Sequence, residues 1–282
     1  MNDWLVLTKA RITALVLVTA AAGYVLGAPN VDFRTLVWLL VGVGLASGGA
    51  AALNQVYERD ADARMTRTAS RPVPAGRISP ARGLAAGLLL SAGGVGWLAI
   101  GINALTGFLA LLTIVLYIAV YTPLKPRTSL NTLVGAIPGA IPPVIGWTAA
   151  TGSIGLGGWA LFSILFLWQL PHFLAIAWLF RDDYARGGFP MLPVVDPAGG
   201  STGRQATLYA LALIPVSLTP TLLGLTGGVY FFGALALGVA FLACGLGMAM
   251  DRGQKGARRL LLASVTYLPI LLALLVLDRV AS

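Results

Sequence analysis

Charged side chains are scarce in this sequence: only 10% of its 282 residues are Asp, Glu, Lys or Arg, whereas 57% are hydrophobic. A soluble domain carries about 25% charged residues, so this chain could not cover a water-facing surface of its size. The single cysteine excludes a disulfide scaffold, and the apolar excess excludes intrinsic disorder. The composition therefore predicts an integral membrane protein.

Nine apolar stretches have about the 20-residue length that a helix needs to cross a bilayer. They cover residues 8–27, 35–57, 82–100, 104–122, 131–150, 158–180, 205–225, 229–250 and 259–278. None of these stretches shows the alternating pattern of a barrel strand. We therefore expect an all-α, polytopic bundle of nine transmembrane helices that forms one domain over residues 1–282. Pro138, Pro142 and Pro143 predict a kink in the fifth span.

The basic residues lie almost entirely on one side of the predicted membrane. With nine spans, all of the 19 Lys and Arg residues except Arg34 and Arg279 fall on the N-terminal side. The positive-inside rule then places the N-terminus in the cytoplasm and the C-terminus outside. Most acids share that side, so ionic chemistry is expected at the cytoplasmic face. The net charge of +9 is thus explained by orientation and anionic partners such as lipids or phosphates, and no nucleic acid partner is expected.

Oxygen-bearing side chains follow the second span. Asn54, Glu58 and Asp62 recur every four residues, so on a continuing helix they form one stripe. Such groups near the bilayer interface are costly unless a cation occupies the site, and Mg²⁺ prefers oxygen ligands together with substrate phosphates. Arg67 and Arg71, which come next, could hold phosphate oxygens. The alternative is a solvated helix end whose arginines only set topology.

A second acidic motif follows the sixth span. Asp182 and Asp183 could complete a metal site facing the first stripe, and because successive helical residues point about 100° apart, only one should face inward. His172, the sole histidine, lies about 16 Å deeper, where an ionisable group is a functional hypothesis, although a hydrogen-bonded neutral imidazole is the alternative. Lys125 and Arg127, between the fourth and fifth spans, are either phosphate donors or topology charges.

Taken together, the two acidic motifs resemble those of the UbiA-type intramembrane prenyltransferases. Within that superfamily the chain is similar to the protohaem IX farnesyltransferase (haem O synthase) branch. The matching stretches are residues 7–11, 54–74, 121–125, 131–147, 171–173 and 183–193. Glu58 stands where the superfamily more often has Asp, Gln55 replaces its common second Asp, and Ala10 replaces a usual Pro. The change at Gln55 puts that residue in doubt as a ligand.

The resemblance implies farnesyl transfer from farnesyl diphosphate to the vinyl group of haem B, giving haem O, with Mg²⁺ as cofactor. It implies catalytic metal ligands at Asn54, Glu58, Asp62 and Asp183, diphosphate donors at Arg67, Arg71, Lys125 and Arg127, and haem binding at His172. It also leads us to expect a multi-pass protein of the cell inner membrane, with the active site at the cytoplasmic face. Association with haem A synthase or with terminal oxidase assembly is a further expectation.

Other functions stay open at this point. Prenyl transfer to a quinone-precursor ring or a chlorin would use the same machinery, although the residues that flank His172 resemble the haem branch. A membrane transporter would show polar or broken helices near the midplane and repeated halves, whereas the acids here gather at one interface. A non-catalytic assembly factor is the remaining alternative.

Overall fold

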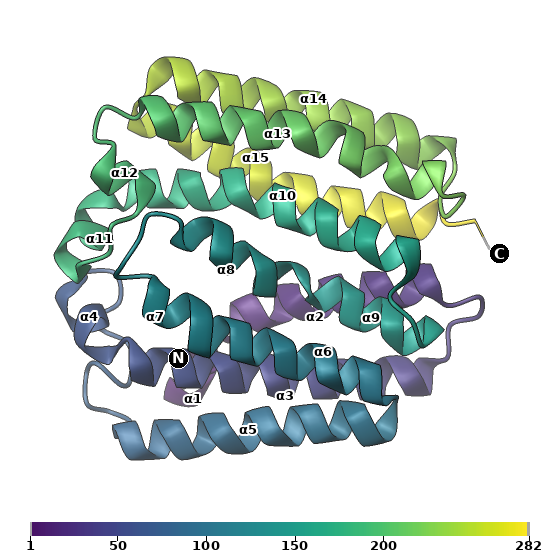
Figure 1. Ribbon diagram of the computed structural model, residues 1–282, viewed down its shortest axis with the longest axis horizontal. Helices are drawn as coiled ribbons and strands as arrows, with labels where there is room; N and C mark the ends of the chain where they lie inside the picture. Colours follow the sequence, from purple (N-terminus) through teal and green to yellow (C-terminus); the bar gives the residue numbers. More distant parts are fainter. Residues whose placement is uncertain (1, 281–282) are drawn as a thin grey trace.

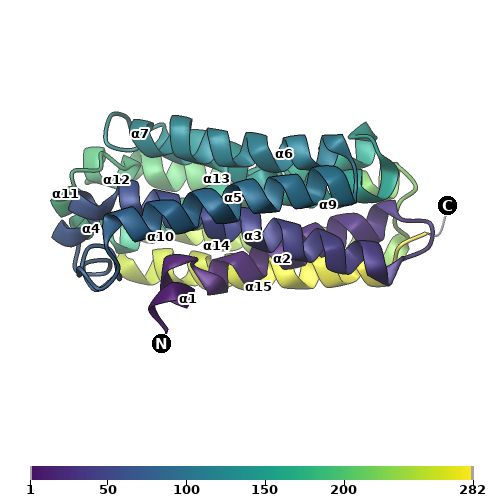
Figure 2. The same cartoon turned by 90° about the horizontal axis from the view of Figure 1, so that it is seen from below.

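The computed structural model describes residues 2–280, which fold almost wholly into helices. The long helices run side by side along one direction, as Figure 1 shows. The short helices α4 (Arg59–Arg64), α11 (Arg181–Gly187) and α12 (Leu192–Val195) lie at one end of the bundle, and the last turn of α15 (Gln254–Leu277) lies at the other (Figure 2). Within residues 2–280, nine helices are long and apolar enough to cross a membrane, so the predicted all-α architecture is confirmed.

The spans follow one another with short connections. They are α2 (Ala10–Gly27), α3 (Phe33–Tyr57), α5 (Pro80–Gly101), α6 with η1 and α7 (Ala104–Val115, Leu116–Tyr121, Thr122–Leu124), α8 with α9 (Asn131–Ala140, Pro142–Thr151), α10 (Gly155–Leu179), α13 (Gly200–Leu222), α14 (Gly228–Asp251) and α15 (Gln254–Leu277), preceded by the short α1 (Asp3–Leu7). Helices α13 and α15 begin before the apolar stretches predicted for them. The residues added are 200–204 in α13 and 254–258 in α15, whose polar and charged side chains hydropathy excludes although the backbone is already helical.

Side-chain caps fix where several spans begin. Asp32 precedes α3 and its carboxylate accepts the backbone N–H groups of Arg34 and Thr35 at 3.2 and 3.1 Å. Ser79 caps α5 in the same way, and Pro80 follows as the first helical residue, where its missing N–H costs nothing. These caps satisfy N–H groups that the start of a helix leaves without partners.

Two of the spans are irregular, the fifth near its middle and the fourth close to its end. The fifth breaks at Ile141, as predicted, because Pro142 and Pro143 offer no N–H to the carbonyls of the preceding turn. The fourth contains the π-helix η1, in which the Thr122 N–H bonds the Tyr117 carbonyl, five residues back. A π-helical turn inside an α-helix is frequent at functional sites, because it rotates the side chains that follow.

Close packing of small residues joins neighbouring spans. A Cβ at Gly94 of α5 would lie 2.5 Å from the Ala46 nitrogen of α3, and one at Gly146 of α9 would lie 1.8 Å from the Ala20 oxygen of α2. Helix backbones therefore touch at these points, as small residues allow in lipid. One hydrophobic core joins α10, α13, α14 and α15, and a second joins α2, α3, α6 and α9.

Candidate active site

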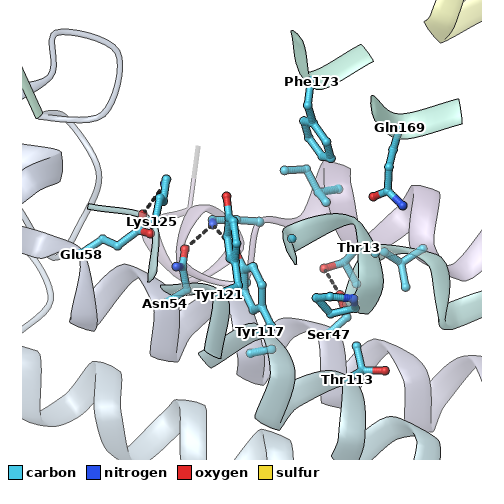
Figure 3. Close-up of a pocket in the computed structure, with 18 of the residues that line it drawn as sticks. Thr13, Ser47, Asn54, Glu58, Thr113, Tyr117, Tyr121, Lys125, Gln169 and Phe173 are labelled. Carbon is cyan, nitrogen blue, oxygen red and sulfur yellow. Dashed lines mark hydrogen bonds and ion pairs between the residues drawn. The ribbon is translucent and has the colours of Figure 1, made fainter. Parts of the chain in front are cut away.

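A cavity of about 480 Å³ lies between α2, α3, the α6–η1–α7 span, the α8–α9 span and α10. Part of its wall is apolar and includes Val16, Val43 and Ile145. Figure 3 shows Glu58 and Lys125 at one end of the cavity, and Gln169 and Thr113 toward the other. The charged side chains in its lining are Lys9, Glu58, Asp62, Arg67, Arg71 and Lys125. A polar, charged end thus continues into a largely apolar space.

The predicted stripe of oxygen ligands forms one wall of this cavity. Helix α3 ends at Tyr57, and Glu58 separates it from α4. The Glu58 N–H nevertheless bonds the Asn54 carbonyl at 2.9 Å, and the Asp62 N–H bonds the Glu58 carbonyl at 2.8 Å, so the four-residue spacing is kept. Asn54, Glu58 and Asp62 are all buried and all line the cavity. The structure therefore brings these three residues together.

Each member of the stripe is held by a cation. The Lys125 ammonium donates to both carboxylate oxygens of Glu58, at 3.1 and 3.0 Å, as Figure 3 shows. Arg71 donates to Asp62 Oδ2 at 2.6 Å. Lys9 donates to Asn54 Oδ1 at 2.8 Å. The ion pairs of Lys125 and Arg71 offset the free energy that it costs to bury the charged carboxylates of Glu58 and Asp62 in a low-dielectric interior.

The charges in this cluster shift one another's pKa values. Burial raises the pKa of Glu58, but the positive charges of Lys125 and Lys9 outweigh it and hold that pKa below its ordinary value. Burial, followed by the charge of Arg71, lowers the pKa of Lys9 to about 8. Burial also acts to lower the pKa of Lys125, but Tyr121 and Glu58 raise it above the ordinary value of a lysine. The carboxylate of Glu58 is therefore ionised and available to a cation.

The donor set of this wall fits a divalent cation. Asp62 Oδ1 is buried and has no hydrogen-bond partner among the described residues, so it retains free lone pairs. Amide and carboxylate oxygens are the ligands that Mg²⁺ prefers, and the ion usually keeps several waters. No three His, Cys, Asp or Glu side chains of residues 2–280 form a metal site by themselves. An ion here would thus need the amide of Asn54, water or phosphate oxygens in addition.

The second acidic motif contacts the loop that follows the first motif, and it does not line the cavity. The carboxylate of Asp183 accepts the backbone N–H groups of Thr66 and Arg67 at 2.9 and 3.1 Å, and it pairs with Arg186. Burial raises the pKa of Asp183, but these hydrogen bonds outweigh it and lower the pKa. The side chain of Asp182 is 86% exposed, so of the two acids only Asp183 faces inward. Through these hydrogen bonds Asp183 holds the loop that contains Arg67 in place.

Two of the predicted diphosphate donors differ in their surroundings. Arg67 lines the cavity, donates to the Tyr184 hydroxyl at 3.1 Å, and its guanidinium lies 4.7 Å from the centre of the Phe180 ring. Arg127 is exposed on the segment after α7 and does not line the cavity. The structure therefore brings Arg67 to the stripe together with Arg71 and Lys125, and leaves Arg127 outside.

His172 lies on the side of α10 that meets α15. Its Nδ1 is 2.7 Å from the Ser264 hydroxyl oxygen, and its ring stacks on Trp168 with centres 5.1 Å apart. The residues of α10 that line the cavity are Gln169, Phe173 and Ile176. His172 is thus not part of the charged cluster, although Phe173, its neighbour in the chain, reaches the cavity.

Sequence reasoning gave no role to several cavity residues, among them Lys9, Tyr117, Tyr121 and Gln169. The rings of Tyr117 and Tyr121 stack with centres 5.6 Å apart, and Gly135 leaves room for the second, because a Cβ there would lie 2.6 Å from that ring. Gln169 donates to the Ala136 carbonyl at 2.8 Å. The sequence contained a signal for three of them. Lys9 and Tyr121 stand in stretches that carry the family resemblance, and Gln169 is an amide inside an apolar span.

Fold and site together define a polytopic membrane protein in which a cluster of acids and cations adjoins an apolar cavity. The chain belongs to the UbiA prenyltransferase family, whose sequence pattern matches residues 16–277. It is 49% identical over 289 residues to the protoheme IX farnesyltransferase of Solibacter usitatus (strain Ellin6076), with 99% of each chain covered.

Several solved structures share the fold, and two of them illustrate the likeness. A digeranylgeranylglyceryl phosphate synthase superposes with a TM-score of 0.81 at 14% identity, covering 98% of this chain and 97% of the other. A UbiA homolog from Archaeoglobus fulgidus bound to GPP and Mg²⁺ has a TM-score of 0.70 at 16% identity, covering 97% and 99%. At these identities the likeness is one of fold.

Proposed function

We propose that the protein transfers the farnesyl group of farnesyl diphosphate to a vinyl group of haem B, giving haem O. The observation that carries this proposal is the position of Asn54, Glu58 and Asp62, with their cations, at the polar end of an apolar cavity. Such an arrangement suits a substrate with a diphosphate head and an isoprenoid tail. The choice of haem B as the farnesyl acceptor is based on the similarity to the relative in Solibacter usitatus, which is a protoheme IX farnesyltransferase.

Asn54, Glu58 and Asp62 would hold Mg²⁺, which when bound supplies positive charge to the diphosphate. Asp183, the fourth ligand expected from the sequence, would first have to give up its bonds to the backbone of Thr66 and Arg67. The bond between the farnesyl C1 and the diphosphate oxygen breaks, and its electron pair leaves with the diphosphate. Cations placed in advance stabilise this developing charge.

The chain's own cations would complete the diphosphate site. Arg71 and Lys125 each hold a carboxylate of the stripe, at 2.6 and 3.0 Å, so they are positioned next to the leaving group. Arg67 would add a guanidinium from the loop that Asp183 fastens. Arg127 would need to move inward to contribute, because its side chain is exposed.

The stacked rings of Tyr117 and Tyr121 would protect the allylic cation. Both line the cavity next to the charged cluster, and Lys125 lies 6.0 Å from the centre of the Tyr121 ring. An aromatic face attracts a cation and also excludes water from it. The cation then bonds to the terminal vinyl carbon, water adds to the inner carbon, and one proton is released with the diphosphate.

The porphyrin would approach from the lipid side of the cavity. A volume of about 480 Å³ suits a single small-molecule ligand, so the farnesyl chain fills it and only the reacting vinyl group enters. Ile12 of α2 and Phe173 of α10 line the cavity and are also 61% and 39% exposed, which supports an opening between these helices. His172 adjoins Phe173 and would orient the macrocycle or ligate its iron through Nε2, since Nδ1 contacts Ser264.

The site would face the cytoplasm from the cell inner membrane. The charged cluster lies at the end of the bundle where α4 and α11 carry basic residues, and the positive-inside rule assigns that end to the cytoplasm. The diphosphate and the haem propionates would meet water there, and the haem O would pass to haem A synthase or to terminal oxidase assembly.

A comparison of acceptors tests the proposal. Purified protein is incubated with farnesyl diphosphate, Mg²⁺ and either haem B or 4-hydroxybenzoate, and the products are separated by chromatography. We expect conversion of haem B alone, and none by Asp62→Asn. Prenylated 4-hydroxybenzoate with unchanged haem would instead establish a quinone-precursor enzyme.

A further inference from the structure

Lys9 is a cavity residue to which neither the resemblance nor the proposed function gives a role. It separates α1 from α2, and its backbone lies in the left-handed region, with φ 49° and ψ 51°. A residue with a side chain adopts this conformation under strain and rarely does so. The turn brings the side chain of Lys9 into the lining of the cavity, next to the oxygen stripe.

The ammonium of Lys9 differs from Arg71 and Lys125 in its partners. Arg71 and Lys125 pair with Asp62 and Glu58, at 2.6 and 3.0 Å. Lys9 donates only to neutral oxygens, the Asn54 amide at 2.8 Å and the Tyr117 hydroxyl at 3.5 Å. Within residues 2–280 no carboxylate lies within 4.0 Å of it. Its charge is therefore not neutralised by an ion pair.

A partly buried cation without a carboxylate attracts an anion. An anion that binds Lys9 would lie in the cavity beside Asn54, because Lys9 contacts that amide. A divalent ion at Asn54 Oδ1 would repel an ammonium that contacts the same oxygen, so Lys9 has to turn away from Asn54 when metal and substrate arrive together. The diphosphate would then offer it an unpaired negative charge, because the carboxylates of Glu58 and Asp62 are already paired with Lys125 and Arg71.

We infer that Lys9 is a further catalytic residue, whose ammonium leaves Asn54 and donates to a nonbridging oxygen of the substrate's diphosphate. This role rests on the proposed function, because it requires a prenyl diphosphate substrate. Lys9 transfers no proton. As the bond between C1 and the bridging oxygen breaks, the electron pair goes to the diphosphate, and the ammonium stabilises the added charge.

Inorganic pyrophosphate is the probe, because it carries the diphosphate without the isoprenoid. Its affinity in the presence of Mg²⁺ is measured by calorimetry on the detergent-solubilised full chain, for wild type, Lys9→Met and Lys9→Arg. Loss of one charge-assisted hydrogen bond should weaken binding by about tenfold to a hundredfold in Lys9→Met. Lys9→Arg should keep most of the affinity. Lys255→Met, which removes an exposed lysine in the first turn of α15, is the matched control and should bind as wild type does.

Thermal unfolding without pyrophosphate separates this role from a structural one. An unpaired cation does not stabilise the fold, so Lys9→Met should unfold at the wild-type temperature or above it. A lower unfolding temperature shared by Lys9→Met and Lys9→Arg would make Lys9 a structural residue and overturn the inference. Unchanged pyrophosphate affinity in Lys9→Met, an equal loss in Lys255→Met, or a wild type that binds no pyrophosphate would overturn it as well. No acceptor is present, so failure of the proposed function would appear separately, as a wild type that binds pyrophosphate but does not farnesylate haem.

Discussion

The ion pair of Glu58 and Lys125 lends itself to a double-mutant cycle, because both side chains are largely buried at the cavity wall. Their exposed fractions are 5% and 13%, and Nζ lies 3.0 Å from Oε2. Two unit charges at that distance attract by roughly 5 kcal/mol at an effective dielectric constant near 20. Water in the cavity and the rest of the cluster reduce this figure, so we expect a coupling free energy of about 2–3 kcal/mol.

The cycle compares Glu58→Gln, Lys125→Met and the double variant. Each single substitution leaves one buried charge without its partner and should destabilise the protein. The double variant removes both charges, so its loss of unfolding free energy should be smaller than the sum of the two single losses. Denaturant unfolding in mixed micelles, followed by tryptophan fluorescence, gives the three values.

An exposed pair provides the control. Arg59 and Asp60 lie 3.3 Å apart with exposed fractions of 46% and 81%, so the cycle of Arg59→Gln and Asp60→Asn should show almost no coupling. If the losses of Glu58→Gln and Lys125→Met add without coupling, the pair does not form in the unliganded protein. The conclusion that the cations of the chain pair with Asn54, Glu58 and Asp62 before substrate binds would then be wrong.

Further predictions concern the reaction. Asp62→Asn keeps the shape of the side chain but removes a charge from the metal site, so turnover should fall by about a hundredfold or more while membrane insertion is retained; near-normal turnover would contradict the site. Tyr121→Leu should lower turnover about threefold to thirtyfold through loss of cation–π stabilisation, with pyrophosphate affinity unchanged in calorimetry. His172→Ala should weaken haem binding, followed by absorbance titration, more than farnesyl diphosphate binding; equal losses would remove the proposed role. Chelation of Mg²⁺ should abolish turnover reversibly, and activity that survives chelation would exclude a metal requirement.

Much of the fold could be predicted from hydropathy, because a bilayer requires long apolar helices whatever their order. The first residues of α13 and α15 could not, since Arg204, Lys255 and Arg258 belong to the helical backbone although their charge lowers the local hydropathy. The break at Ile141 was predictable from Pro142 and Pro143, because proline removes a specific donor.

The sequence predicted which site residues lie together only where their spacing along one helix determines their positions. Asn54 and Asp62 share a wall because the helical bonds continue through Glu58. The bonds of Asp183 to a loop more than 100 residues away depend on tertiary packing, which spacing does not encode. The role of Tyr117 could not be predicted because a π-helical turn changes the helical register. The role of Lys9 could not be predicted because its left-handed backbone interrupts the helical pattern between α1 and α2.

The most direct test of the account is mass analysis of haem after purified protein acts on haem B and farnesyl diphosphate with Mg²⁺ in isotopically labelled water. The account predicts a haem that gains one farnesyl group and one hydroxyl, with the label in that hydroxyl, and no such product from Asp62→Asn. Haem that keeps its original mass while the wild type consumes farnesyl diphosphate would contradict it.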